Sequence, residues 1–333
     1  MSEKEKPLSD GALAGEITNK GLDSNSVGDR IEKYTRAKHR QDVILDHLRT
    51  VSSAKCKPPI VGTIDYNKTI ANISQCFNYL VFHDYYTVGE NRLVKAMSCK
   101  KHLLCAPCAI RRASKATMAY LDKFNEINAA HIDLEAHMLT LTVKNGHDLE
   151  ERFNHLQSSM KKILKSRRNY ASNGRGFNEF CKIQGAVYSY ELSHSEKGWH
   201  PHIHIIILLK KGTQIDFNQL NPKASQLSKD WHKVTGDSFI VDCRPIVGDT
   251  PVKGFIEVFK YALKFSDLTA EQNVFAYSFL RSKRLQGSFG LFRGVEIPES
   301  LDEDPLANLP FIELIYKYYN SNYSLQKHTH VEV

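Results

Sequence analysis

Hydrophobic and polar positions follow regular periods along the second half of the chain, and the period changes from one segment to the next. Residues 137–144 (HMLTLTVK) alternate Leu139, Leu141 and Val143 with more polar neighbours, which predicts a half-buried strand. Residues 148–168 instead carry apolar side chains three and four positions apart, which predicts a helix with one buried face. The same reasoning predicts strands over residues 183–193, 200–209 and 238–244, and helices over residues 29–50, 216–234 and 251–266.

From residue 137 onward, the predicted elements occur in the order strand, helix, strand, strand, helix, strand, followed by one further helix. This is the split βαβ order of ferredoxin-like and RRM-like folds, so we expect an α+β protein with an antiparallel sheet. Residues 194–199 (HSEKGW) join two of the strands and suit a hairpin. We expect the helices to pack on one face of the sheet and the other face to be free for a site. Because such a fold hosts many functions, it does not by itself indicate one.

Composition and charge narrow the class of protein. The 333 residues are 41% hydrophobic and 25% charged, as in ordinary globular proteins. No apolar run approaches the length of a membrane helix, and the start MSEKEKPLSDG lacks the apolar core of a signal peptide, so we expect a cytoplasmic protein. A formal net charge of +8 favours a polyanionic partner such as DNA. Three basic clusters are expected to follow a DNA track: Lys100, Lys101, Arg111 and Arg112; Lys161, Lys162, Lys165, Arg167 and Arg168; and Arg281, Lys283 and Arg284.

Three histidines, His200, His202 and His204, occupy alternate positions of the strand predicted over residues 200–209. Side chains two positions apart on a strand share one face, so the imidazoles point the same way. Glu191 on the hairpin partner could add a carboxylate oxygen to the same ion. Mixed nitrogen and oxygen ligands with open positions suit Mn²⁺ or Mg²⁺ acting as a Lewis acid on phosphate. The alternative is an exposed sheet face that merely carries histidines.

The cysteines are concentrated before residue 110. Their total is seven, and an odd number without a secretion signal argues against a disulfide framework. Cys105 and Cys108 form a Cys-x2-Cys knuckle typical of zinc-binding thiolates, and Cys76 and Cys99 would complete a structural Zn²⁺ site. His102 is a competing ligand. A set of free cytosolic thiols and a redox pair are the other interpretations.

Four polar residues share one stripe of the helix predicted over residues 251–266. Glu257, Lys260, Tyr261 and Lys264 have the spacing i, i+3, i+4 and i+7. A tyrosine hydroxyl with its ordinary pKa of about 10 is a poor nucleophile, so a nearby lysine ammonium or metal would be needed to favour the phenolate. Glu257 could be a general base for a water molecule. Taken alone, the pattern also describes a surface helix with i,i+4 ion pairs.

The segments WHPHIHIIILL (199–209) and EVFKYALK (257–264) together resemble the single-tyrosine rolling-circle plasmid replication initiators, which are HUH endonucleases. His202 and His204 match the His-hydrophobic-His motif. MLTLTVKN (138–145) is similar to the first motif of the family, and GSFGLFRG (287–294) resembles a less specific C-terminal segment. The resemblance covers roughly residues 60–295.

The tyrosine motif is matched by Glu257 four residues before Tyr261 and by Lys264 three residues after it. The tyrosine follows the histidines, as in replication initiators and related transposases, whereas in conjugative relaxases it precedes them. A transposase of the two-tyrosine type would need a second tyrosine nearby, and Ala262, Leu263 and Phe265 supply none.

The resemblance implies an HUH endonuclease that nicks one strand at the double-strand origin of a plasmid. Tyr261 would join to the 5′ phosphate and leave a 3′ hydroxyl that primes synthesis, and the subgroup with a glutamate at the position of Glu257 is thought to use water for termination. The implied partners are origin DNA, single-stranded or hairpin at the nick, and a host helicase and DNA polymerase in a bacterium, with a homodimer left open. Arg111, Arg112 and Lys260 are the expected DNA contacts.

Four regions follow from these observations. They are a disordered arm (1–28), a helical, cysteine-rich region that binds zinc and contacts DNA (29–130), the HUH endonuclease domain (131–295) and a C-terminal tail (296–333). Two other functions compete with the replication initiator. A related HUH transposase or mobilisation relaxase would transfer strands into new targets or mobilise them, and a non-enzymatic zinc-containing DNA-binding protein would form no covalent adduct with DNA.

Overall fold

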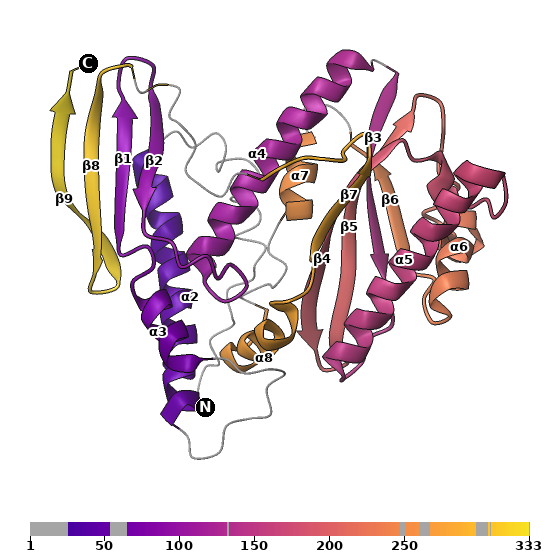
Figure 1. The fold of residues 1–333 in the computed structure, drawn as a ribbon, viewed down its shortest axis with the longest axis horizontal. Helices are drawn as coiled ribbons and strands as arrows, with labels where there is room; N and C mark the ends of the chain where they lie inside the picture. Colours follow the sequence, from indigo (N-terminus) through magenta and orange to yellow (C-terminus); the bar gives the residue numbers. More distant parts are fainter. Residues whose placement is uncertain are drawn as a thin grey trace. The chain divides into compact units, whose positions relative to one another are not determined.

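The structure is a computed structural model and describes residues 26–53, 65–131, 133–246, 251–259, 267–297, 306 and 308–332 (Figure 1). The chain divides into two compact units. The first unit comprises Met1–Arg112, Phe265–Arg281 and Pro298–Val333, and the second comprises Ala113–Lys264 and Ser282–Ile297. The first unit therefore joins residues near both ends of the sequence, which the hydrophobic pattern places in separate regions.

The second unit is built on a five-stranded antiparallel sheet with the strand order β6-β3-β5-β4-β7. The four predicted strands lie in it with the fourth beside the first and the third beside the second, as in a split βαβ fold. The expected α+β architecture with an antiparallel sheet is confirmed. The strands are β3 (Leu134–Thr142), β4 (Gly185–Ser195), β5 (Gly198–Lys210), β6 (Val241–Pro245) and β7 (Gln286–Gly290).

Helices α5 (Leu149–Asn173) and α6 (Gln226–Thr235) lie on the sheet face that carries Ile203, Ile205 and Ile207 of β5, all fully buried. α5 begins where the side chain of Asp148 accepts the Glu151 N–H, and it ends at Gly174, whose φ of +70° suits glycine. α6 begins later than the predicted residue 216. Pro222 lacks an N–H and stands in a short 3-10 turn, and the segment before α6 folds back so that the Asn218 N–H donates to Ser225 Oγ at 2.7 Å.

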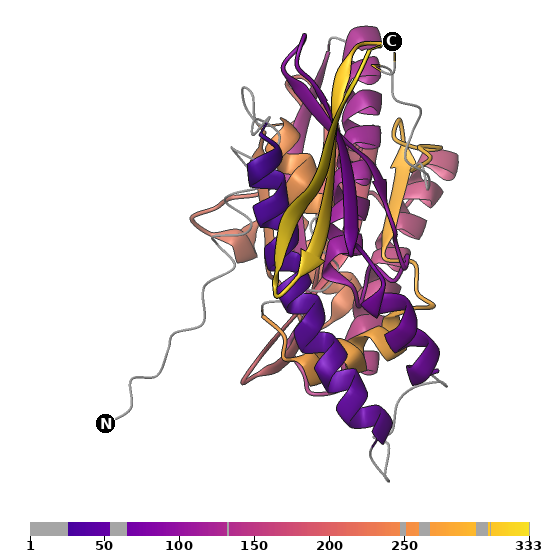
Figure 2. The same cartoon turned by 90° about the vertical axis from the view of Figure 1, so that its left-hand side faces the viewer.

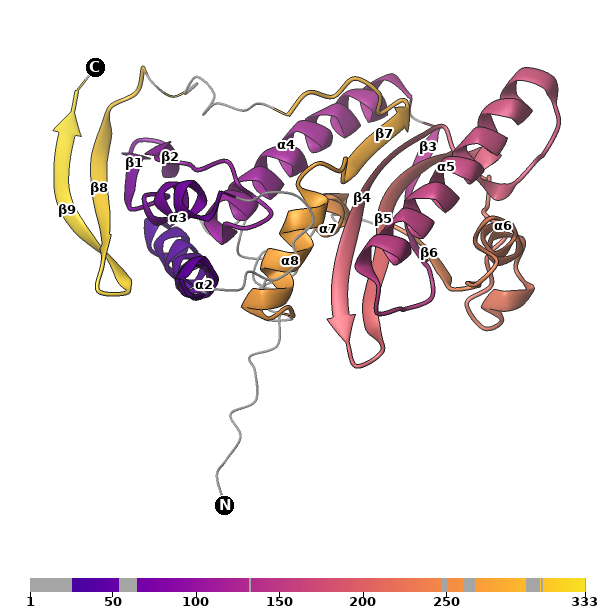
Figure 3. The same ribbon diagram turned by 60° about the horizontal axis from the view of Figure 1, so that its bottom comes forward.

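The opposite face of this sheet is partly covered, which corrects the expectation of a free face. Helix α4 (Ala106–Ala130) and helix α7 (Pro251–Phe259) pack there over Val187 and Ile206, and Figure 3 shows helices on both sides of the sheet. The Tyr120 ring of α4 stacks on the Phe259 ring of α7 with centroids 4.9 Å apart. No individual helix is predicted from the sequence over the residues of α4, so its packing against the sheet is not predicted either.

The first unit contains a separate antiparallel sheet with the order β2-β1-β8-β9. Residues 296–333, expected as a tail, contain two of its strands, and Figure 2 shows this yellow hairpin beside the violet strands β1 and β2. Asn320 and Ser321 have positive φ angles of 46° and 61°, as the tight turn of a two-residue hairpin loop requires. The elements are α2 (Val27–Ser53), α3 (Tyr66–Ser74), β1 (Tyr79–Tyr85), β2 (Glu90–Ala96), α8 (Ala270–Leu280), β8 (Phe311–Tyr319) and β9 (Asn322–Val331).

The helix predicted over residues 29–50 is present as α2 and extends beyond both predicted ends. Its first residues, Val27 and Gly28, fall in the segment expected to be a disordered arm, and residues 1–25 lie outside the described part of the chain. None of the described helices is long and apolar enough to cross a membrane.

Candidate functional site

The structure brings together the three residues expected to bind a catalytic metal. Glu191 of β4 lies directly opposite His202 of β5 in the strand register. Oε2 of Glu191 is 3.4 Å from Nε2 of His202 and 3.1 Å from Nε2 of His204. One donor atom from each residue lies within 4.8 Å of the other two. His200 is not a member of this group, although its ring stacks on that of His202 with centroids 5.3 Å apart.

The far nitrogens of both imidazoles are held by neighbouring polar groups. Nδ1 of His202 lies 3.2 Å from the carbonyl oxygen of His200, so it carries the proton and donates to that oxygen. Nδ1 of His204 lies 3.2 Å from the hydroxyl of Thr140 on β3. These contacts turn both Nε2 atoms toward Glu191 and leave them available as metal ligands.

The spacing of the three residues fits one divalent cation. Ligand atoms at about 2.1 Å from a common ion lie about 3.0 to 3.4 Å apart, which agrees with the two distances from Glu191 Oε2. Glu191 is 2% exposed and His202 is 7% exposed. A buried carboxylate is costly unless a proton or a cation compensates its charge. Three protein ligands leave coordination positions open for a substrate oxygen or water.

Glu257 of α7 lies at the border of this cluster. Its Oε1 is 4.0 Å from Nε2 of His204, and its side chain is 38% exposed. The hydroxyl of Ser189 on β4 donates to the carbonyl oxygen of Val258, which fixes α7 over the sheet beside Glu257. The other residues of the predicted tyrosine stripe, Lys260, Tyr261 and Lys264, lie outside the described residues.

Thr140 and Ser189 were not among the predicted site residues. Both stand on the histidine face of the sheet, because each is paired with His204 in the register of its strand. The alternation of residues 137–144 already places Thr140 opposite to the buried leucines. The alternation does not show which strands pair. The pairing of β3 with β5 is what places Thr140 beside His204.

A contact between the loop after β3 and the first residues of β5 holds the end of β5 that carries the histidines. The Trp199 N–H donates to the carbonyl of Gly146 at 2.7 Å, and the Gly146 N–H donates back to the carbonyl of Trp199 at 3.1 Å. Gly198 has a φ of +89°, and a Cβ there would clash with the carbonyl of Gly146. The predicted hairpin over residues 194–199 is present with a tight turn, since β4 ends at Ser195 and β5 begins at Gly198.

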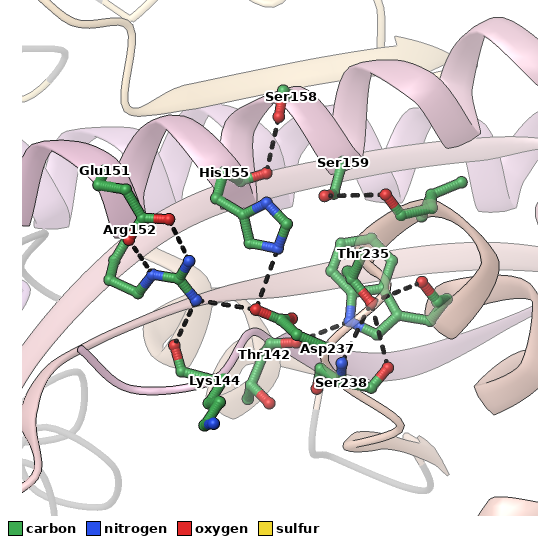
Figure 4. A network of polar contacts seen from close by, with 12 residues as sticks. Thr142, Lys144, Glu151, Arg152, His155, Ser158, Ser159, Thr235, Asp237 and Ser238 are labelled. Atoms are coloured by element: carbon green, nitrogen blue, oxygen red, sulfur yellow. Dashed lines mark hydrogen bonds and ion pairs between the residues drawn. The ribbon is translucent and has the colours of Figure 1, made fainter.

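A polar network on the α5 and α6 side of the sheet supports the loop that follows β3 (Figure 4). Nη1 of Arg152 donates to Asp237 at 2.8 Å and to the carbonyl of Lys144 at 3.3 Å. The indole N–H of Trp231 donates to the carbonyl of Thr142 at 2.7 Å. Because Thr142 pairs with His202 in the register, these bonds tie α5 and α6 to the strand beside the histidines.

The four predicted zinc ligands meet in the first unit. The sulfur atoms of Cys76 and Cys108 are 3.4 Å apart, and those of Cys99 and Cys108 are 3.6 Å apart. Cys105 lies 3.6 Å from Cys76. A tetrahedral zinc ion with bonds of about 2.3 Å places its sulfurs about 3.8 Å apart, so the group fits a four-thiolate site. The group does not include His102.

The protonation of these thiols depends on their mutual contacts. Burial, followed by hydrogen bonding with Cys108, raises the pKa of Cys105. Hydrogen bonds from Cys105, Cys76 and Cys99 lower the pKa of Cys108. The three neighbouring thiols therefore stabilise one thiolate, that of Cys108. The other thiols would release their protons when a metal ion binds to their sulfur atoms.

The predicted basic clusters do not all lie beside the histidines. Lys161, Lys162, Lys165 and Arg168 are exposed on α5, which covers the opposite face of the sheet. Arg167 instead donates to the carbonyls of Phe180 at 3.1 Å and Ile183 at 2.7 Å, so it is a structural residue. The α5 cluster therefore cannot share one face of the sheet with the histidines, which corrects the expectation of a single track. On α4, Arg111 is half-buried and Arg112 is exposed.

Residues 90–313 match the family described as replication protein. A "Protein rep" of Bacillus amyloliquefaciens is 24% identical over 243 residues, which are 71% of this chain and 64% of that protein, so the chain spans less than two thirds of its length. A "Protein rep" of a Bacillus species is 25% identical over 238 residues, which are 64% of this chain and 72% of that protein. No solved structure matches the chain.

Proposed function

Because the chain belongs to the replication protein family, we propose that it initiates rolling-circle replication by nicking one strand of a plasmid at its double-strand origin. Membership of this family agrees with the resemblance that the histidine and tyrosine motifs indicate. The observation that carries the nicking activity is the cluster of His202, His204 and Glu191, whose donor atoms lie within 4.8 Å of one another on a rigid sheet. A protein that only binds DNA has no need of such a group.

His202, His204 and Glu191 would hold Mn²⁺ or Mg²⁺, and the bound ion would polarise the scissile phosphate. The hydroxyl oxygen of Tyr261 would attack the phosphorus while the bond to the 3′ oxygen breaks. The tyrosine proton would pass to a water molecule, and the departing 3′ oxygen would take up a proton from water to become the 3′ hydroxyl that primes synthesis. Lys260 or Lys264 would favour the phenolate and offset the charge that develops on the phosphate.

Glu257 is proposed to act when replication has returned to the origin. A single tyrosine that stays esterified to DNA cannot attack a second time, so another nucleophile must complete the cycle. Glu257 lies beside the ligand cluster, 4.0 Å from His204, and is partly exposed. A carboxylate in that position can take a proton from a water molecule that attacks the second phosphate.

The four cysteines of the first unit would bind a structural Zn²⁺ ion. Arg111 and Arg112 follow the last of these cysteines on α4 and would contact DNA phosphates, as would Lys260. A host helicase would then unwind the duplex at the nick, and a host DNA polymerase would extend the 3′ hydroxyl. The protein would carry out these steps in the bacterial cytoplasm, on single-stranded or hairpin DNA at the origin.

The proposal is tested by incubating the full chain with single-stranded origin DNA and Mn²⁺ and searching for a covalent protein–DNA adduct. We expect an adduct with the wild type, none with Tyr261→Phe, and an unchanged amount with Tyr170→Phe, a matched control on α5. An adduct peptide that contains another tyrosine would refute the role of Tyr261. DNA binding without an adduct under any divalent metal would favour a non-enzymatic protein, and insertion of the cut strand into new targets would favour a transposase.

A further inference from the structure

Lys38 of α2 is an unusual residue, because its side chain is almost completely buried. It is 2% exposed and is among the largest fully buried side chains of the described chain. Lysine is almost never fully buried unless its charge is compensated. No described carboxylate is within 4.0 Å of its ammonium group; Asp42, one turn further along α2, is the acidic group that acts on it most strongly, followed by the thiols of the cysteine cluster. The direct contacts of Lys38 show which of these acidic groups its ammonium group touches.

The ammonium group lies against the cysteine cluster. Nζ of Lys38 donates to the carbonyl of Cys76 at 3.0 Å and to Oδ1 of Asn78 at 3.0 Å. It also lies 4.8 Å from the centre of the Tyr318 ring, within the range of a cation–π contact. All of these residues belong to the first unit.

Cys76 lies at the unfavourable end of a helix dipole, and one backbone N–H, that of Cys99, donates to its sulfur at 3.2 Å. It follows the C-terminal end of α3, and its N–H donates to the carbonyl of Ile73 at 2.9 Å. The C-terminal end of a helix carries partial negative charge. Cys105 and Cys108 are placed differently, directly before and within the first turn of α4, where the positive end of the helix dipole favours thiolates. A cation on the side of Cys76 would offset the negative charge that the end of α3 adds there.

We propose that Lys38 is a positioning residue of the four-cysteine centre: its ammonium group, held on the carbonyl of Cys76, offsets the negative charge of the metal-bound thiolates and so strengthens Zn²⁺ binding. Four thiolates and one Zn²⁺ ion carry two net negative charges, and burying that charge is costly without a nearby cation. This inference rests on the proposed zinc site but not on nicking by Tyr261.

A purely structural role is the competing explanation, and Gln41 provides the matched control. Gln41 lies on the same helix, is 0% exposed, and donates from its amide to the carbonyl of Ile73 at the end of α3. Both side chains therefore hold the end of α3 from α2, Gln41 at a carbonyl of its last turn and Lys38 at the carbonyl of Cys76 just beyond it. Only Lys38 brings a charge, so a comparison of the two separates capping from charge compensation.

The experiment measures Zn²⁺ affinity of the full chain by competition with a chelator, for the wild type and for Lys38→Met, Lys38→Gln and Gln41→Met. We expect both Lys38 variants to lose about 10-fold to 100-fold in affinity, as substitutions next to metal ligands do, and Gln41→Met to lose clearly less. The thermal unfolding midpoint in excess chelator should fall by similar amounts in Lys38→Met and Gln41→Met, because both lose a buried cap. Lys38→Gln keeps a donor group and serves if Lys38→Met does not fold.

Equal Zn²⁺ affinities for the wild type and the Lys38 variants would overturn the inference and leave the zinc site intact. Equal losses in the Lys38 and Gln41 variants would also overturn it, because capping alone would then explain them. A wild-type protein that binds no Zn²⁺ would refute the zinc site itself, and the role of Lys38 with it.

Discussion

Nε2 of His204 lies 3.1 Å from a carboxylate oxygen of Glu191 on the adjacent strand. The two residues are separated in the register by two positions on each strand, because Glu191 pairs with His202 and His204 pairs with Ser189. The diagonal contact is possible because both side chains project from the same face of the sheet. A cation shared by this pair and His202 is the simplest reason for burying a glutamate among imidazoles.

His204→Ala should reduce nicking of origin DNA at least about 100-fold, because loss of one of three ligands removes several kcal/mol of charge stabilisation at the phosphate. His200→Ala is the control and should have a much smaller effect, since His200 lies outside the ligand group. The rate of strand cleavage in Mn²⁺ is the measurement. Undiminished cleavage by the wild type in excess EDTA would refute a metal-dependent reaction.

Thr140→Val should weaken divalent-metal binding about 10-fold while leaving the fold intact, because its hydroxyl holds Nδ1 of His204 at 3.2 Å. Valine keeps the shape of the side chain and its preference for strands. Titration with Mn²⁺, followed by its paramagnetic signal, measures the affinity. Thr213→Val, a substitution in the loop after β5, is the control, and equal affinities in the two variants would argue against orientation of His204 by Thr140.

Glu257→Gln should leave the first nick within about threefold of the wild-type rate, since Glu257 borders the ligand group without belonging to it. Termination should fail, because the amide cannot accept a proton from water, and replication products should exceed one plasmid unit. Gel analysis of products from a plasmid with one origin tests this. Loss of the first nick would instead make Glu257 a metal ligand or the base for Tyr261, and unit-length circles would mean that another group activates the water.

Cys105→Ser should abolish binding of one Zn²⁺ ion per chain and lower the unfolding midpoint of the first unit by at least about 5 °C, because structural zinc contributes directly to folding. Cys181→Ser, a free cysteine of the second unit, is the control and should keep the metal. Elemental analysis and calorimetry of protein purified under reducing conditions provide the two readings. Absence of zinc from the wild type would refute the site.

Four of the five strands of the second unit could be predicted because each carries its own hydrophobic pattern, from Leu139 in β3 to Ile207 in β5, whereas β7 was not predicted. The helices were harder to delimit. The helical spacing of residues 216–222 predicts a helix, but these residues form a loop whose Asn218 N–H donates to the Ser225 hydroxyl. Local periodicity also does not report which helices cover a sheet, so the packing of Tyr120 against Phe259 was not predicted.

The two metal-ligand groups were predictable because residue type and spacing are themselves the signal. His202 and His204 share a strand face by period, and Cys105 and Cys108 share one short turn. The residues that hold these ligands were not predictable, since Thr140 contacts His204 and Lys38 contacts Cys76 across elements that are far apart in the chain. The strands after residue 310 were missed because an acidic segment before them suggested a tail.

The sheet of the first unit has a consequence for how the protein is made. β1 pairs with β8, so Asp84 meets Ile312 from near the other end of the sequence. During synthesis, the main segment of the second unit leaves the ribosome before β8 exists, so this unit can fold first. Until β8 arrives, one edge of β1 has no partner strand and can pair with other chains. Nascent or C-terminally truncated chains should therefore aggregate through the first unit, and chaperones should engage them there.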